Sequence, residues 1–186
     1  MRPRLVVLAG PNGAGKSTFH RLFLQDSGLP FLNADVLQLN TGIDGYEAAR
    51  AVDAARLAYL EIKAGFITET VFSDPEGRKL AFLHKAIAAG YDVTLIYIGL
   101  VGPELAQRRV AQRVASGGHA VPAEKVASRY PRSLANFAKA LEFVPAVHLF
   151  DNSTLAEYRR LGVFKNGRLM EKTGGTIPQW ARRFFP

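Results

Sequence analysis

One segment limits the possible folds of this chain more than any other: the run Gly10-Pro11-Asn12-Gly13-Ala14-Gly15-Lys16-Ser17. It matches the pattern GxxxxGK, followed by serine or threonine, at every defined position. Small residues let consecutive backbone N–H groups surround a phosphate, and a following helix adds its positive N-terminus. Apolar residues 4–9 precede the run, and a helical pattern over residues 16–25 follows it. The sequence therefore predicts a phosphate-binding loop between a buried strand and a helix.

The loop assigns chemistry to individual side chains. Lys16 is placed to reach the β- and γ-phosphates of a nucleoside triphosphate, and the Ser17 hydroxyl is placed to act as a ligand of Mg²⁺. We therefore predict ATP and Mg²⁺ as cofactors, with Ser17 as the metal-binding residue. The predicted nucleotide-binding residues of this segment are Gly10, Pro11, Asn12, Gly13, Ala14, Gly15, Lys16, Ser17 and Thr18.

The rest of the chain alternates between strand and helix patterns. Strands are expected at residues 4–9, 29–35, 65–73, 92–100 and 146–153. Helices are expected at residues 16–25, 46–64, 76–89, 103–117 and from Pro122 onward, where Pro131 should kink or break the helix. This alternation predicts a single α/β domain over residues 1–186, with the P-loop NTPase fold and a parallel five-stranded sheet covered by helices on both faces. Asn166-Gly167 predicts a C-terminal β-hairpin.

Acidic residues stand near the ends of three predicted strands. Ligands of such sheets bind beyond the carboxyl ends of the strands, so we expect Gly10–Ser17, Asp35, Glu69 and Asp151 to share one cleft. There Asp35 would bind a substrate hydroxyl and accept its proton during phosphoryl transfer. The alternative role for Asp35 is a helix N-cap. Glu69 and Thr70 are predicted to bind substrate, and the alternative for them is a buried, structural strand end.

A series of arginines follows the fourth predicted strand. It comprises Arg108, Arg109, Arg113, Arg129 and Arg132. We expect residues 103–132 to form a helical lid whose arginines offset the charge of the transferring phosphoryl group. Arg113 and Arg129 are assigned to catalysis and Arg109 to nucleotide binding. The alternative is a solvated basic helix face.

The composition narrows the class of protein. The 186 residues include no cysteine, which excludes disulfides, cysteine-based metal sites and thiol chemistry. No apolar run approaches roughly 18 residues, so we predict no membrane span and expect a cytoplasmic protein. The formal net charge of +8 is consistent with an anionic ligand or with a scattered basic surface.

Three functions remain open at this stage. The leading prediction is an ATP-dependent kinase that transfers the γ-phosphoryl group to a hydroxyl of a small molecule. The sequence lacks the NKxD motif of switch GTPases and the strand-terminal Asp-Glu pair of ATPase motors. The second possibility is a polynucleotide 5′-hydroxyl kinase, for which the charge is the only additional argument, so nucleic acid is not the expected partner. The third is a nucleotide-gated binding protein that performs no phosphotransfer.

Several segments taken together resemble the zeta toxin family of P-loop kinases, which are related to the toxins of bacterial toxin–antitoxin pairs. Besides the phosphate loop, they are NAD at residues 33–35, ETVFS at 69–73, RVAQRVASGGHAVP at 109–122 and RYPRSLANF at 129–137. The similarity covers roughly residues 4–153, in a short form of the family.

This resemblance implies an ATP-dependent kinase whose best-known relatives phosphorylate the 3′-hydroxyl of the sugar in UDP-N-acetylglucosamine. It implies Lys16 as the phosphate-binding lysine, Asp35 as the general base and Glu69 as an acid that helps bind substrate. The two phosphate-clamping arginines of the family would be found among Arg109, Arg113 and Arg129, with His119 as a further candidate. An antitoxin partner cannot be read from the chain itself.

Overall fold

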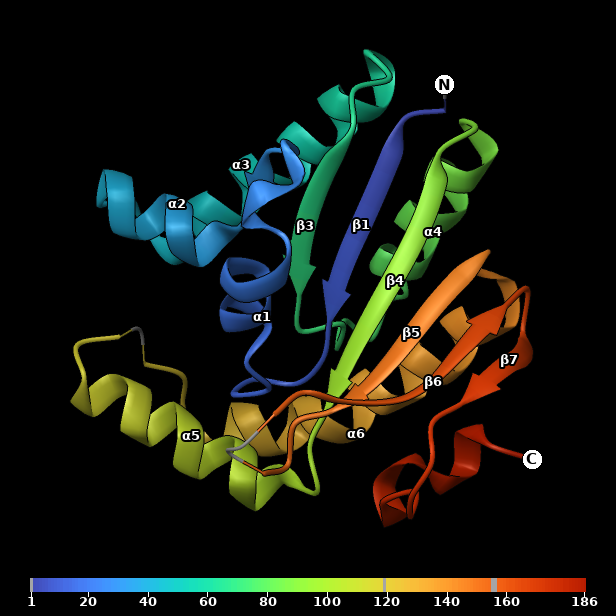
Figure 1. Ribbon diagram of the computed structural model, residues 1–186. Helices are drawn as coiled ribbons and strands as arrows, with labels where there is room; N and C mark the ends of the chain where they lie inside the picture. The colour runs from blue at the N-terminus through green and yellow to red at the C-terminus, as the bar shows by residue number, and fades with distance from the viewer. Residues whose placement is uncertain (1, 119, 155–156) are drawn as a thin grey trace.

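A single sheet runs through the middle of the molecule (Figure 1). The computed structural model describes residues 2–118, 120–154 and 157–186, and in these residues seven strands pair in the order β2-β3-β1-β4-β5-β6-β7. The strands are β1 (Arg4–Ala9), β2 (Phe31–Leu32), β3 (Phe66–Thr70), β4 (Asp92–Gly99), β5 (Ala146–Asp151), β6 (Arg159–Lys165) and β7 (Arg168–Lys172). Strands β1 to β5 pair in parallel, whereas β6 and β7 are antiparallel at one edge.

The predicted α/β class and the five parallel strands are confirmed. The hairpin at Asn166-Gly167 is also present, and both residues have the positive φ that a type I′ turn requires. This hairpin continues the main sheet, which therefore has seven strands instead of the predicted five. Strand β2 is much shorter than the predicted 29–35, because Pro30 cannot donate to the ladder and a helix begins directly after Asn33.

Helices follow most of the strands. They are α1 (Lys16–Phe23), α2 (Ala34–Thr41), α3 (Gly45–Glu61), α4 (Arg78–Ala88), α5 (Pro103–Ala115) and α6 (Ala123–Phe143), with short 3₁₀ turns η1 (Gln25–Ser27) and η2 (Gln179–Phe184). Helix α2 was not predicted. Of the two outcomes expected at Pro131, a kink or a break, the break is wrong, because helix α6 continues through the proline. Tyr130 and Phe137, on either side of it, are buried and hold the helix in place. No helix in the described parts of the chain has the length and apolar character needed to cross a membrane.

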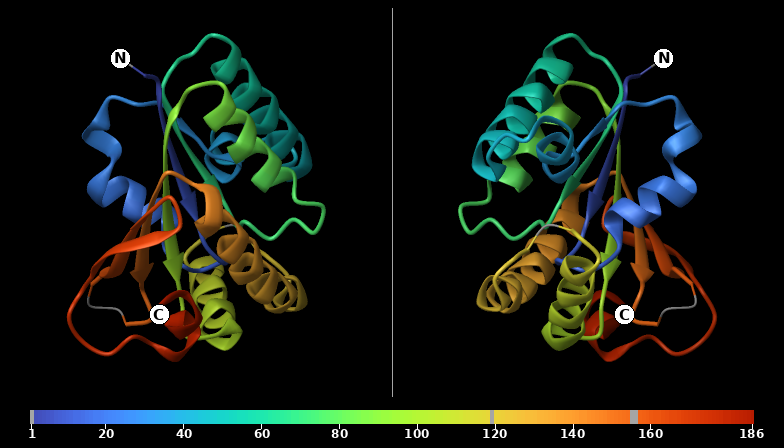
Figure 2. Two further views of the ribbon diagram at one scale, coloured as in Figure 1. Left: turned by 90° about the vertical axis from the view of Figure 1, so that its right-hand side faces the viewer. Right: turned by 90° about the vertical axis from the view of Figure 1, so that its left-hand side faces the viewer.

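The two faces of the sheet carry separate layers of helices. Because side chains alternate along a strand, Leu5 and Val7 of β1 pack on one face while Val6 and Leu8 pack on the other. Helices α3 and α4 and the C-terminal part of α6 cover the first face, whereas α1, α5 and the N-terminal part of α6 cover the second. Figure 2 shows α1 on one side of the sheet and α3, α4 and α6 on the other.

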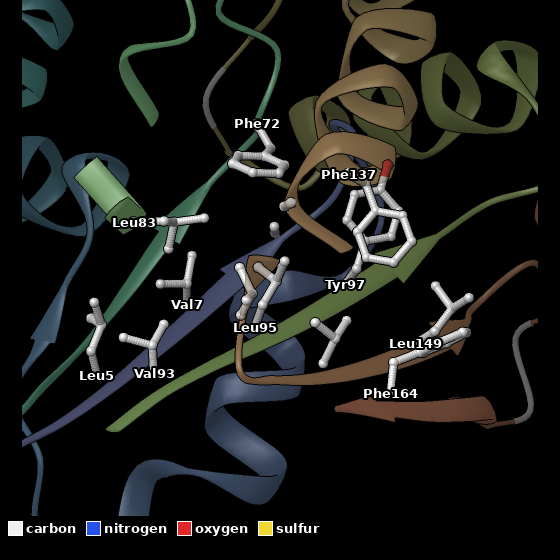
Figure 3. Packing of buried hydrophobic residues seen from close by; sticks show 14 of the residues in the cluster. Leu5, Val7, Phe72, Leu83, Val93, Leu95, Tyr97, Phe137, Leu149 and Phe164 are labelled. Atoms are coloured by element: carbon white, nitrogen blue, oxygen red, sulfur yellow. The ribbon is translucent and has the colours of Figure 1, made fainter. Parts of the chain in front are cut away.

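The larger apolar cluster fixes the strands that lead to the phosphate loop. Figure 3 shows Val7 of β1 near Leu83 of α4, and Leu5 of β1 near Val93 of β4; all four side chains are almost completely buried. Tyr97 of β4 stacks on Phe137 of α6 with 4.1 Å between the ring centres. This packing holds the carboxyl ends of β1, β3 and β4 at one edge of the sheet, where the candidate site lies.

Candidate active site

The phosphate loop joins β1 to α1 at the carboxyl end of the sheet (Figure 1). Gly10 has a φ of 145°, and a Cβ at this position would lie 2.1 Å from the carbonyl oxygen of Ile98. Gly15 has a φ of 86°, and a Cβ there would lie 2.6 Å from the hydroxyl of Tyr158 and 2.8 Å from Nδ2 of Asn152. Only glycine satisfies both the backbone conformation and the close approach at these positions.

Two side chains from outside the loop hold its backbone in place. Nδ2 of Asn152 donates to the carbonyl oxygen of Ala14 at 2.9 Å, and the hydroxyl of Tyr158 donates to that of Gly15 at 2.7 Å. Burial raises the pKa of Tyr158, so its hydroxyl keeps the proton that it donates. Sequence reasoning missed both roles. The position of Asn152 directly after β5 was an available signal, whereas Tyr158 lies in an irregular segment without a motif.

Lys16 is buried at the start of α1, with 5% of its side chain exposed. Its ammonium group donates to the carbonyl oxygen of Pro11 at 3.1 Å and lies 3.6 Å from Oε1 of Glu69. Burial lowers the pKa of Lys16, while the carboxylates of Glu69 and Asp35 act in the opposite direction. The lysine is therefore held against the phosphate loop by one neutral and one charged partner.

Glu69, at the end of β3, links the phosphate loop to the segment after β2. Its Oε2 accepts hydrogen bonds from the Ser17 hydroxyl at 2.7 Å and from Nδ2 of Asn33 at 2.8 Å. A serine hydroxyl beside a carboxylate supplies the hard oxygen donors that Mg²⁺ prefers. The residues present thus fit the predicted metal, with Ser17 as its ligand and Glu69 next to it.

Asn33, and not Asp35, caps helix α2. Its Oδ1 accepts the backbone N–H of Asp35 at 2.8 Å and that of Val36 at 3.2 Å. The capping alternative for Asp35 is therefore wrong, and its carboxylate, which is 55% exposed, is free for other contacts. One of these is the guanidinium of Arg113 on α5, at 3.9 Å.

A cavity of about 720 Å³ lies beside the phosphate loop and α1. Leu22, Phe23 and Tyr158 give it apolar walls, while Thr18 and Arg109, both predicted to bind the nucleotide, line it as well. Arg109 also donates to the carbonyl oxygen of Thr154 at 3.4 Å. A mixed apolar and polar cavity of this kind suits a nucleoside.

A second cavity, of about 440 Å³, opens on the α3 and α6 side of the same edge. Among its lining residues are Asn33, Asp35, Glu69, Thr70, Arg129 and Arg132. It thus brings together Asp35, Glu69 and Thr70, the three residues assigned to the substrate. Arg129, which was assigned to phosphate clamping, lines this cavity.

A third cavity, of about 530 Å³, lies between α2 and α5. Ser17, Asp35 and Arg113 line it, and Asp35 is therefore shared with the second cavity. Helices α5 and α6 occupy most of the predicted lid at residues 103–132, and His119 within that stretch lies outside the described residues.

Asp151 does not join this group, contrary to the expectation from the strand ends. Its Oδ1 accepts a hydrogen bond from the indole N–H of Trp180 at 3.0 Å, and its Oδ2 lies 3.7 Å from the guanidinium of Arg159. Both oxygens of this carboxylate have partners that come after β5 in the chain, since Arg159 begins β6 and Trp180 belongs to η2. Asp151 is a buried structural residue.

The parallel strand order and the phosphate loop define a protein with a P-loop kinase-like fold, which implies nucleotide binding. Comparison with known sequences identifies the family of this protein. Residues 5–139 match family AAA_33, described as an AAA domain, and the chain belongs to this family. An uncharacterized protein of Haemophilus influenzae is 31% identical over 136 residues, which cover 70% of this chain and 94% of the relative.

Solved structures with the same fold include three of particular interest. The AvrRxo1-ORF1:ORF2 complex with ATP superposes with a TM-score of 0.73 at 16% identity; the match covers 98% of this chain and only 62% of that chain. The PezAT toxin–antitoxin system of Streptococcus pneumoniae has a TM-score of 0.58 at 17% identity, over 96% and 75% of the two chains. Shikimate kinase from Acinetobacter baumannii with shikimate has a TM-score of 0.54 at 18% identity, over 83% and 86%.

Proposed function

We propose that this protein is an ATP-dependent kinase that transfers the γ-phosphoryl group to a hydroxyl of a small molecule. The observation that carries the proposal is the position of Asp35. This carboxylate lines both the cavity that contains Ser17 and Arg113 and the cavity that contains Glu69 and Thr70. A base at such a junction can contact an acceptor hydroxyl on one side and the reacting phosphate on the other.

The proposed reaction assigns one task to each group. Asp35 takes the proton of the acceptor hydroxyl as its oxygen forms a bond to the γ-phosphorus, while the bond from that phosphorus to the bridging oxygen breaks and ADP departs. Lys16 and Arg113 offset the negative charge on the transferring group. Ser17 would hold Mg²⁺, which would supply positive charge to offset that of the phosphates. Thr70 and Glu69 border the acceptor.

Similar proteins support this choice. The AvrRxo1 structure holds ATP, and the shikimate kinase structure holds shikimate, a hydroxyl compound. The likeness to PezAT agrees with the zeta toxin resemblance of the sequence and makes UDP-N-acetylglucosamine the first acceptor to test. An antitoxin-like protein is the partner to test.

The test is incubation with labelled ATP, Mg²⁺ and a panel of UDP-sugars and other hydroxyl compounds, followed by mass spectrometry of the acceptor. Asp35→Asn should lower transfer by about 100-fold or more while ATP binding persists. Asp26→Asn, which alters an exposed acid of η1, is the matched control and should transfer at the normal rate. Retained transfer by the Asp35 variant would refute the role of the base. ADP formation without any phosphorylated acceptor would favour a nucleotide-gated binding protein.

The net charge of +8 supports one second candidate, a polynucleotide 5′-hydroxyl kinase. Binding to a short single-stranded DNA with a 5′-hydroxyl would then weaken steeply as salt is raised, because counterions are released from the backbone. Absence of salt-sensitive binding would remove this candidate.

A further inference from the structure

The 440 Å³ cavity carries more charged groups than phosphoryl transfer requires. Besides Asp35 and Glu69, the charged residues that line it are Asp53, Arg56, Asp74, Lys79, Arg129 and Arg132. They come from α3, α4, α6 and the segment between β3 and α4. A bound molecule would interact mainly with those charged groups that have no partner within the protein.

One group of these charges is internally satisfied. Asp53 accepts hydrogen bonds from Arg56 and, at 2.7 Å, from Nζ of Lys79. Arg56 is buried and also donates to the hydroxyl of Thr68 at 2.7 Å and to the carbonyl oxygen of Glu69 at 2.8 Å. Each of these three side chains thus has a partner of opposite charge, although the group as a whole keeps a net charge of +1.

The charged groups on the opposite wall of the cavity are not paired in this way. Within the described residues, the guanidinium of Arg129 forms no hydrogen bond or ion pair. Arg132 uses its Nε to contact the carbonyl oxygen of Ser73 at 3.1 Å, and its two terminal amino groups have no partner among the described residues. Oδ1 of Asp74 is buried and likewise lacks a hydrogen-bond partner there. Two guanidinium groups therefore line the cavity with unused donor capacity, whereas Oδ1 of Asp74 is covered by other atoms of the protein.

The segment that carries Asp74 is firmly held. Nδ2 of Asn136 on α6 donates to the carbonyl oxygens of Phe72 and Asp74, each at 3.0 Å. Phe72 is buried and has a φ of 62°, a strained conformation for a residue other than glycine that persists only where the surroundings enforce it. The wall made by α6 and this segment is thus a preformed surface rather than a flexible tip.

We propose that the acceptor of this site carries an anionic group, a phosphate or a carboxylate, which Arg129 and Arg132 bind. The inference rests on the proposed kinase function and specifies its substrate class. Arginine is suited to both anions because its planar donor group matches their oxygens in pairs. Arg129 accordingly contacts the acceptor, and Asp35 contacts the hydroxyl that reacts.

The test separates anion binding from turnover. The nucleotide site is filled with a non-hydrolysable ATP analogue and Mg²⁺, and inorganic phosphate or malonate is then titrated by calorimetry. At least one of the two should bind to the wild type, and Arg129→Gln or Arg132→Gln should weaken this binding by about tenfold or more. Binding of phosphate but not of malonate, or the reverse, identifies the class of anion that the site accepts.

Controls distinguish this inference from the kinase proposal. Arg50→Gln removes the same charge from the exposed side of α3 and should leave anion binding within about twofold of the wild type. Arg129 makes no contact that the fold needs, so its variant remains informative if the Arg132 variant unfolds. Failure of both anions to bind, or equal binding by the wild type and the Arg129 variant, overturns the inference. Because no step requires turnover, this result is independent of the Asp35→Asn assay.

Discussion

The hydroxyl of Ser17 donates a 2.7 Å hydrogen bond to Oε2 of Glu69, although 52 positions separate the two residues in the chain. Strands β1 and β3 are adjacent in the sheet, so their carboxyl ends bring the phosphate loop and this acid together. The same carboxylate lies 3.6 Å from the ammonium of Lys16. Glu69 therefore connects the predicted metal ligand Ser17, the buried Lys16 and the 440 Å³ cavity.

Glu69→Gln should weaken binding of Mg²⁺-ATP by about tenfold or more, because the neutral amide no longer compensates Lys16 or attracts the metal. Isothermal titration with ATP at several Mg²⁺ concentrations measures this effect. Glu61→Gln changes an exposed acid at the end of α3 and serves as the control. Unchanged affinity and unchanged magnesium dependence would contradict the role given to Glu69.

Lys16→Met should weaken ATP binding by about 100-fold or more and should alter the pH dependence of the free energy of unfolding. Burial lowers the pKa of Lys16 in the folded protein below the ordinary value of 10.5. At a pH below the pKa of Lys16 in the folded protein, this lysine is protonated in both the folded and the unfolded state. The folded protein then bears the full cost of burying the positive charge. As the pH rises toward 10.5, the unfolded state binds more protons than the folded state, so the free energy of unfolding increases.

The measurement compares denaturant unfolding of the wild type and Lys16→Met from about pH 7 to the ordinary lysine pKa. The methionine variant should be the more stable of the two at the lower end, and the difference should shrink as the pH rises. A difference that stays constant over this range would show that Lys16 is not destabilising the folded protein through its charge.

Tyr158→Phe and Asn152→Ala should each reduce ATP affinity by roughly fivefold to tenfold, because each removes a hydrogen bond that holds the phosphate loop. Fluorescent-nucleotide titration measures the affinity. Tyr46→Phe removes a hydroxyl from a largely exposed tyrosine on α3 and should have no effect. Equal affinities for Tyr158→Phe and Tyr46→Phe would mean that the loop keeps its conformation without this support.

Gly99→Ala should destabilise the protein by about 1–3 kcal/mol, because the new Cβ would lie 2.1 Å from Cη2 of the Trp180 ring. Trp180 is the single tryptophan of the chain, so its fluorescence reports displacement of η2 directly. Gly174→Ala is the matched control, since a Cβ there meets no atom within 4 Å. An unshifted emission maximum together with an unchanged melting temperature would refute the close packing at Gly99.

The local sequence pattern was sufficient to predict the phosphate loop and the class of fold. The spacing of Gly10, Gly15 and Lys16 depends on the conformation of one short turn, and the alternation of apolar strands with helices requires a covered parallel sheet. Such features are encoded within a few consecutive residues, so they can be read before any long-range contact is known. The arginines of α5 could be found in the same way, through their helical spacing.

Only the tertiary structure decided which strand ends share a site. Glu69 joins Ser17 because β3 lies next to β1, whereas Asp151, at an equally plausible strand end, is paired with Trp180 from the C-terminal segment. The structure likewise placed Arg129 in the 440 Å³ cavity, beside Asp35 and Glu69. By itself, the sequence determined the loop, the alternating elements and the residue types available for chemistry. The pairing of charges followed from strand order and from the return of the chain's end across β5, since these contacts join residues far apart in sequence.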